Sequence, residues 1–397
     1  MQGSWKRAAR RRASALALLI WAALSAAGAA PAAEDAGAPA PEPASRFFDP
    51  EDGWFDVSGF LDTAYGFVPL VAPITEPAVG YGAAGALVFI DRNVPAEGQR
   101  HARPNIAIAG GLSTENGTRG VFAGHLGTWM GGRLQTLVGV ADADINLDFF
   151  GLGGDRRPGG TGLPYAVAAR GGAAGASYRA GETPLWLGLR YGLANTRVTP
   201  RGADPSLLGI PQSERELRLA GLTPSITLDT RDNFFTPTDG WYADLSVTLF
   251  REALGSDRDF DKADLTVMYY RSLSRSLFLG ARGSVKTSSS GTPFYLRPFV
   301  MLRGVQALQY QGEEAAEAEA ELRWQLHPRF SLVGFGGVGV ARAGAAGRDT
   351  EKAVTSGGAG FRYLVARTYG LHMGMDVGFG PDEAILYVVF GSAWVRP

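Results

Sequence analysis

One arginine and a row of glutamates are the residues whose types and spacing suggest chemistry. Arg303 stands beside Gly304 in the apolar stretch FVMLRGV, and Glu317, Glu319 and Glu321 alternate with small or apolar residues in AEAEAELRWQL. A guanidinium presents a rigid fork of donors that fits carboxylates, so these residue types are suited to an ion pair. The glutamates alone would also suit Ca²⁺, but no liganding loop accompanies them. A solvated external loop is the alternative interpretation of Arg303.

Other arrangements that support catalysis or cofactor binding are incomplete. The sequence contains no Cys and no G-x-S-x-G stretch. GYGAAG and GFGGVG match the dinucleotide-binding pattern, but both lie inside alternating strands instead of opening a helix. His372 and Asp376 share one strand face. Such a pair is more typical of hydrogen-bonded side chains in a barrel wall than of the active site of an acyl hydrolase. The histidines lack zinc-site spacing: His101, His125, His327 and His372. We therefore predict no enzyme, no cofactor and no metal site.

The N-terminus indicates export. Basic residues precede the short apolar run ALALLIWAAL and the small residues AAGAAPAA, which is the pattern of a cleavable signal peptide over residues 1–33. Residues 34–54 are rich in Pro and Ala and predict a disordered linker. The net charge of −1 gives no reason to expect nucleic acid as a partner.

From residue 79 onward, apolar residues recur with period two. In WYADLSVTLF, Trp241 and Leu245 fall on one face, and Tyr242 and Asp244 on the other. A soluble sandwich also alternates, but an export signal, segments of about ten residues and many polar-face glycines favour a membrane barrel. We predict an all-β transmembrane antiparallel β-barrel over residues 79–397, with residues 55–78 as a periplasmic lead-in segment or the first strand.

Strand parity refines this prediction. About fifteen alternating segments can be identified, whereas single-chain bacterial barrels normally have an even number. The short links at 272–275 and 327–329 suit periplasmic turns, so 288–314 is expected to be an extracellular loop. FDVSGFLDTAYGF at 55–67 is a candidate for the missing strand, which gives about sixteen strands.

The stretch DTRDNFFTPTDG joins two predicted strands through turn-forming residues. It resembles the D-x-R-x-N…P-x-x-G turn of the BamA/TamA superfamily of outer-membrane assembly and translocation proteins, the bacterial surface antigen family. The resemblance implies a periplasmic turn motif formed by Asp229, Arg231, Asn233, Pro237 and Gly240. ITEPAVGYG at 74–82 resembles the start of the barrel in short members of this family.

The Arg-Gly pair matches a second feature of this superfamily, in which the long loop after the eleventh strand folds into the lumen. The resemblance implies a structural lock of Arg303 and Gly304 with Glu321, Phe335 and Gly339.

Two positions depart from the family pattern. Val305 replaces an aromatic residue, and Gly337 falls where assembly factors usually have Asp, so one acidic partner of the arginine is expected to be missing.

The family resemblance implies insertion of membrane proteins or translocation of polypeptide through a weak seam between the first and last strands. The expected location is the Gram-negative outer membrane, with lipid, substrate polypeptides or a periplasmic partner as the contacts. Only about 25 to 45 residues separate the signal peptide from the first strands, too few for a POTRA module, so a barrel-only member is expected. The alternative is a passive pore or structural barrel without clients, and a lipid-modifying barrel enzyme is a third hypothesis. The last strand is expected to end at Trp394 as an outer-membrane terminal aromatic residue.

Overall fold

The computed structural model describes residues 46–63, 66–91, 105–151, 162–201, 212–345 and 348–394. These residues form sixteen β-strands and a few short helices. The strands are β1 (Gly66–Ile74), β2 (Gly82–Asp91), β3 (Asn105–Thr114), β4 (Arg119–Trp129), β5 (Leu134–Phe149), β6 (Leu163–Arg179), β7 (Leu185–Pro200), β8 (Glu216–Asp229), β9 (Gly240–Phe250), β10 (Phe260–Ser272), β11 (Leu277–Ser288), β12 (Glu314–His327), β13 (Phe330–Ala345), β14 (Arg348–Ala366), β15 (Leu371–Phe379) and β16 (Ala384–Phe390).

The helices are single turns or little more. They are α2 (Ser58–Thr63), η2 (Pro77–Val79), η3 (Met130–Gly132), α3 (Gln212–Arg215), η5 (Glu252–Leu254) and η6 (Phe294–Leu296). Within the described ranges, none of them has the length and apolar character needed to cross a membrane.

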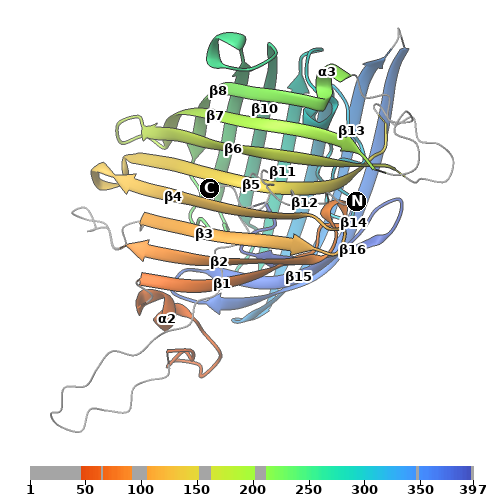
Figure 1. The fold of residues 1–397 in the computed structure, drawn as a ribbon. Coiled ribbons are helices and arrows are strands. Elements are labelled where there is room, and N and C mark those ends of the chain that lie inside the picture. Colours follow the sequence, from red (N-terminus) through yellow and green to blue (C-terminus); the bar gives the residue numbers. More distant parts are fainter. Residues whose placement is uncertain are drawn as a thin grey trace, which may run out of the picture.

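The strands form one antiparallel sheet in sequence order, which curls into a nearly closed barrel (Figure 1). Alternate side chains face outward and inward along each strand. In β9, for example, Trp241 is 49% exposed on the outer face, whereas Tyr242 is 5% exposed on the inner face. Outward apolar side chains suit contact with lipid. A nearly closed sheet also leaves few backbone groups unpaired in the hydrocarbon. The predicted antiparallel barrel of sixteen strands is confirmed.

The barrel has two different ends. The end at which α2 lies and at which short links join β4–β5, β6–β7, β10–β11, β12–β13 and β14–β15 is called the turn end (Figure 1). The opposite end carries the segment 289–313 between β11 and β12 and is called the loop end.

The first strand lies later in the sequence than the candidate at 55–67. Residues 58–63 are helical, and β1 begins at Gly66. Two prolines, Pro69 and Pro73, interrupt the β1 sequence GFVPLVAPI and make it look unlike a strand. Its period of two is nevertheless regular, with Val68 and Leu70 buried and Val71 exposed. The barrel therefore begins at residue 66, inside the segment 55–78.

Residues 46–54 are also more ordered than a disordered linker. Phe48 and Phe55 form an antiparallel bridge, and Asp49 and Asp52 pair with Arg329 of the β12–β13 turn. The Pro/Ala-rich composition of the preceding residues conceals the turn-forming acidic stretch DPEDGWFD, which carries these contacts. Residues 1–45, which include the predicted signal peptide, lie outside the described part of the chain.

The C-terminal strand is shorter than expected. β16 ends at Phe390, and Gly391, with a φ of 74°, turns the chain away from the sheet. Trp394 is 6% exposed and lies inside the lumen against Tyr270, not at the end of a membrane strand. A left-handed glycine at the end of the strand is the local cause of this departure.

A seam separates β1 from β16. The sheet order ends at these two strands, and the described residues contain no pairing between them. The Glu115 N–H donates to the Tyr81 carbonyl at 2.8 Å, so odd-numbered residues at this end of β2 face β3. Even-numbered residues therefore face β1, where they pair with even-numbered partners such as Leu70.

The odd-numbered residues of β1, including Pro69 and Pro73, consequently point their backbone groups at the seam. Proline has no N–H, so two donors are missing from this edge.

Replacing Pro69 and Pro73 together with Val should strengthen the seam. Each restored donor is worth about 0.5–1.5 kcal/mol when it finds an acceptor on β16, so the gain should be about 1–3 kcal/mol. We expect a higher temperature for loss of the folded band on heat-modifiability gels. Val71→Ile, on the same edge but with its N–H already present, is the matched control. A double variant that melts together with this control would contradict the assignment of the prolines to the seam.

Candidate functional site in the barrel lumen

The segment between β11 and β12, residues 289–313, folds into the lumen from the loop end. Its apolar side chains are buried against inward-facing residues of β12, β13 and β14. This cluster contains Val300, Leu302, Val305, Tyr310, Ala315, Ala341 and Val354. At the opposite wall, Phe294 of η6 packs against Phe149 and Tyr165. The loop therefore contacts walls on both sides of the lumen.

Arg303 lies at the centre of this loop and contacts three carboxylates. Its Nε donates to Glu319 Oε1 at 2.6 Å, and its Nη1 donates to Glu321 Oε2 at 2.7 Å and to Asp376 Oδ2 at 2.8 Å. The arginine and two of these partners are almost fully buried, with 7% of the Arg303 side chain, 1% of Glu319 and none of Asp376 exposed. Such a buried cation needs charged acceptors to offset the loss of water.

Aromatic rings cover the remaining faces of the guanidinium. Its Cζ lies 3.7 Å from the centroid of Phe335 and 5.7 Å from that of Trp394. The Trp394 indole also donates to Glu319 Oε1 at 3.0 Å. Cation–π contact adds attraction where water is excluded. Phe335 thus lies where the family resemblance places it, whereas the indole comes from the C-terminal tail.

Glycines let the loop approach the wall. Gly304 has a φ of 91°, and a Cβ there would lie 2.8 Å from the backbone of Gly378 and Phe379. A Cβ at Gly339 would lie 2.4 Å from Val300 Cγ1, and one at Gly337 would lie 2.8 Å from Leu302 Cδ2. All three positions exclude larger residues for steric reasons.

Asp376 of β15 is the partner that sequence reasoning missed. At Gly337, where assembly factors usually have Asp, the space on the lumen side is filled by the Leu302 side chain. The third carboxylate around Arg303 comes instead from Asp376. Asp376 also accepts from Arg362 Nη2 at 2.9 Å, so one carboxylate joins two cations. Its inward position was visible in the alternation of β15, but its proximity to Arg303 depends on how the barrel closes.

Cationic side chains pair with the glutamate row. Glu317 accepts from Lys286 Nζ at 2.7 Å and lies 3.8 Å from Arg282, while Glu319 and Glu321 contact Arg303. No group of three or more metal-binding side chains is present in the described ranges. His372 instead makes structural contacts, since its Nδ1 lies 3.2 Å from both Thr236 Oγ1 and the Gly370 carbonyl oxygen.

The same loop touches both sides of the seam. The Gly304 N–H donates to the Tyr387 hydroxyl of β16 at 2.9 Å, whereas the Ala307 N–H donates to Glu76 Oε1, next to β1, at 3.2 Å. Burial raises the pKa of the Glu76 carboxyl above its ordinary value, although the N–H donors of Ala307 and Ala78 offset part of this effect. The loop therefore connects β1 and β16 indirectly at the loop end.

The predicted turn motif folds on itself at the turn end. Asp229 accepts two hydrogen bonds from the Arg231 guanidinium, both at 2.8 Å, and the guanidinium lies 4.5 Å from the Tyr242 ring centroid. Asn233 Oδ1 accepts from the Phe235 N–H at 2.7 Å, which forms an Asx turn. Pro237 is buried.

Gly240 closes this turn at a φ of 112°, where a Cβ would lie 2.4 Å from the Thr230 carbonyl oxygen.

This turn also contacts the far side of the barrel. Asn233 Nδ2 donates to the Tyr369 carbonyl of the β14–β15 turn at 2.9 Å, and the Ser392 N–H donates to the Phe235 carbonyl at 2.6 Å. The motif thus holds both the β14–β15 turn and the C-terminal tail. Sequence reasoning identified the turn but not these contacts.

Comparison with known proteins agrees with this geometry. Residues 187–381 match the Omp85 superfamily domain. This chain carries an Omp85 superfamily domain. The match confirms the resemblance to the BamA/TamA superfamily inferred from the turn and the Arg-Gly pair. The Omp85 barrel is a fold of the Gram-negative outer membrane. Comparison with curated protein sequences gives no match.

Solved structures show the same fold at low identity. BamA from Haemophilus ducreyi lacking POTRA domains 1–3 is similar at a TM-score of 0.59 and 11% identity, over 83% of this chain and 70% of that one. CdiB from Escherichia coli gives 0.54 and 12%, over 81% and 61% of the two chains. CdiB from Acinetobacter baumannii gives 0.52 and 11%, over 82% and 59%. This chain thus spans less than two thirds of either CdiB chain.

Replacing Arg303 with Ala should destabilise the barrel. The change leaves buried carboxylates without their cation, a situation that typically costs about 3–5 kcal/mol. We expect a correspondingly lower urea midpoint for unfolding, together with faster protease cleavage within 289–313. Arg342→Ala is the matched control, because its pair with Glu351 is exposed and worth about 1 kcal/mol or less. Equal midpoints for the two variants would show that the buried cluster does not hold the loop.

Proposed function

We propose that this protein assists the insertion of membrane proteins into the outer membrane, or the translocation of polypeptide across it, through the seam between β1 and β16. The Omp85 domain and the likeness in fold to BamA and CdiB support an assembly or translocation role. The proposal includes export by the signal peptide at residues 1–33. Its expected contacts are outer-membrane lipid, a client polypeptide and a periplasmic partner.

The seam is the observation that carries the proposal. An unpaired strand edge inside a membrane leaves N–H and C=O groups without partners, which costs free energy and makes the edge ready to pair with another strand. Here the β1 edge also lacks two donors, at Pro69 and Pro73, so a continuous ladder with β16 would be weak. A wall that opens at one place gives an extended polypeptide a route between lumen and lipid.

The filled lumen argues against a simple pore. The loop at 289–313 crosses the lumen and is held by the buried Arg303 cluster, and the β8–β9 turn reaches the β14–β15 turn at the other end. A conducting channel needs an open aqueous path, whereas a lateral route needs only a seam. A passive or structural barrel is therefore the alternative that the experiment below must distinguish.

Closing the seam covalently should abolish the activity. Because the chain contains no Cys, Val71→Cys and Leu386→Cys place the only thiols on the exposed faces of β1 and β16, and bis-maleimides of increasing length are applied to join them. The assay follows folding of an eight-stranded outer-membrane barrel into liposomes that contain the protein. We expect faster folding with the uncrosslinked variant and no acceleration after crosslinking.

The control crosslinks two strands that are already paired. Leu245→Cys and Leu265→Cys lie opposite each other on β9 and β10, so joining them should leave the rate unchanged. If liposomes with and without the protein fold the client at the same rate, the insertion hypothesis is wrong. Steady conductance in planar bilayers under those conditions would then favour the passive pore.

A further inference from the structure

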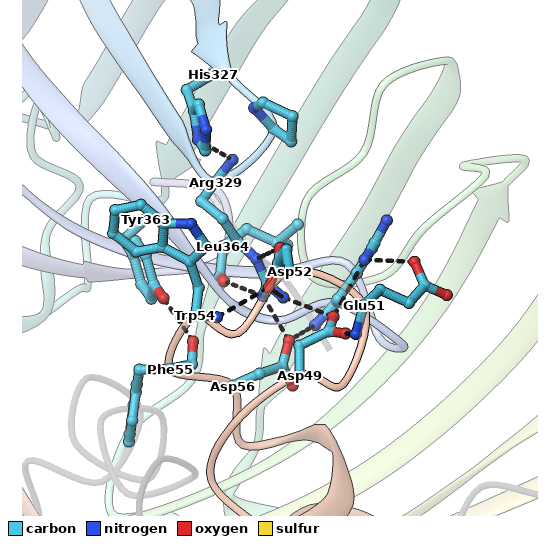
Figure 2. Close-up of polar contacts among 12 residues, drawn as sticks. Asp49, Glu51, Asp52, Trp54, Phe55, Asp56, His327, Arg329, Tyr363 and Leu364 are labelled. Carbon is cyan, nitrogen blue, oxygen red and sulfur yellow. Dashed lines mark hydrogen bonds and ion pairs between the residues drawn. The ribbon is translucent and has the colours of Figure 1, made fainter.

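An acidic loop at residues 49–56 surrounds one arginine at the turn end. Arg329, in the β12–β13 turn, is 1% exposed, and its donor groups face three carboxylates (Figure 2). Its Nη2 lies 2.6 Å from Asp49, its Nε 2.6 Å from Asp52 and its Nη1 2.5 Å from Asp56. Nη1 also donates to the Leu364 carbonyl at 3.1 Å. The guanidinium is thus paired on every edge.

The loop is shaped for this contact by its own backbone. Asp49 Oδ1 accepts from the Glu51 N–H at 2.7 Å, and Asp52 Oδ1 accepts from the Trp54 N–H at 3.0 Å. Gly53, with a φ of 72°, turns the chain between Asp52 and Trp54. Asx turns of this kind fix carboxylates in position before the partner is met.

Further bonds join this segment to β14 and the β14–β15 turn. The Val57 N–H donates to the Val365 carbonyl at 2.8 Å, and the Thr368 N–H donates to Ser58 Oγ at 3.1 Å. The Tyr363 hydroxyl donates to the Phe55 carbonyl (Figure 2). Residues 46–63 are therefore fixed to the side of the seam that includes β14, β15 and β16.

The helix α2 in the same segment also packs on the other side of the seam. Phe60 is 3% exposed in a cluster with Val68 and Leu70 of β1 and with inward residues of β2, β4 and β5. Val57 and Leu61 contact this cluster and also the cluster of Val365, Ala366 and Leu371. One short helix therefore bridges the two walls, immediately before the chain enters β1 (Figure 1).

We propose that residues 46–63 are a latch that holds the seam closed at the turn end and frees it when the acidic loop leaves Arg329. The latch replaces strand pairing with side-chain contacts, because β1 and β16 lack a ladder of their own. It rests on the proposed function only in treating the seam as a route for polypeptide. Its effect on the width of the seam can be measured without any client.

Spin labels across the seam test the latch directly. The cysteine-free chain is labelled at Pro69→Cys and Phe390→Cys, which lie nearer the turn end of β1 and β16, and the distance between the labels is measured by pulsed electron resonance in liposomes. Replacing Asp49, Asp52 and Asp56 with Asn keeps their shape and removes their charge. We expect a longer and broader distance distribution in this triple variant. Glu351→Gln, which breaks an exposed pair with Arg342 away from the latch, should leave the distance unchanged.

Two further observations keep the test decisive. Asp49→Asn alone should give a smaller change in the same direction, which covers the case in which the triple variant does not fold. If cleavage by chymotrypsin at Trp54 or Phe55 shows that the segment has been released in either variant and the distance across the seam stays that of the unmutated chain, the latch is wrong.

A covalent lock separates the latch from the proposed function. Ser58→Cys and Thr368→Cys, whose parent residues are joined by a hydrogen bond, should form a disulfide under oxidation that fixes the segment in place. Oxidation should then slow client insertion, and a reductant should restore it. A seam that widens in the labelled triple variant while the unmodified protein inserts no client would support the latch and refute the insertion hypothesis.

Acid should also release the latch. The hydrogen bond from Arg329 lowers the pKa of Asp52 below its ordinary value, and although burial raises the pKa of Asp56, bonds from Ser58 and Arg329 lower it more. A depressed carboxylate pKa stabilises the latched state above the ordinary value and loses that contribution as the pH falls through the shifted one. The charged and titratable groups at this site are Asp49, Glu51, Asp52, Asp56, His327, Arg329, Tyr363 and Arg367.

We therefore expect a constant distance across the seam from neutral pH down to about 5, and a longer one below about 4, where unperturbed aspartates protonate. His327→Gln should keep this transition, since it removes the imidazole and leaves the carboxylates. A transition that disappears in that variant would assign the effect to His327 and contradict the role of the aspartates.

Discussion

The buried contact of Arg303 with Glu319, Glu321 and Asp376 is the interaction on which the interior of this barrel depends. Sixteen strands enclose more space than inward side chains fill, so the lumen must take in another segment or stay wet. The loop at 289–313 meets that need, but it brings a cation into a site closed to water. Three carboxylates on two strands compensate for that burial, and they fix where the loop can lie.

The position of the loop in turn determines how the seam is held. Gly304 reaches Tyr387 on β16, and Ala307 reaches Glu76 beside β1, so the loop spans the gap at the loop end. At the turn end, α2 spans it with apolar contacts to both walls. Two strands that lack a ladder are thus held by two inserted segments. Side-chain contacts can separate one at a time, whereas a ladder resists opening along its whole length.

Much of the fold follows from residue patterns, and the exceptions have physical causes. The period of two in strands such as β9 predicts a barrel, and the resemblance of the Arg-Gly pair to the BamA/TamA superfamily predicts an inward arginine. Pro69 and Pro73 make β1 hard to recognise as a strand from sequence. Prolines are tolerated in edge strands, but which strands lie at an edge is known only once the sheet is assembled. Contacts between segments far apart in the sequence are even harder to predict from residue patterns. Asp376 lies 73 residues from Arg303, and only the curvature of the whole sheet brings them together.

The acidic loop illustrates the same limit. Its sequence, DPEDGWFD, shows turn-forming residues and carboxylates, yet nothing in it points to an arginine 273 residues further along the chain. The Arg329 turn appears simply as the short link HPR. Local propensity explains how each partner is shaped, and the closure of the barrel explains why they meet.

The two buried arginines differ in how easily they can lose their partners. Arg303 is held in a loop anchored to strands at both ends, and Asp376 beside it has no exposed surface. Arg329 is equally buried, but 26% of the Asp52 side chain and 9% of the Asp49 side chain are exposed. Water can therefore solvate the carboxylates of Asp49 and Asp52 as they leave Arg329. It cannot solvate Asp376 until the loop itself moves. The same chemistry thus gives a permanent fastening at the centre of the lumen and a reversible one at the turn end, where the seam meets the chain that leads into β1.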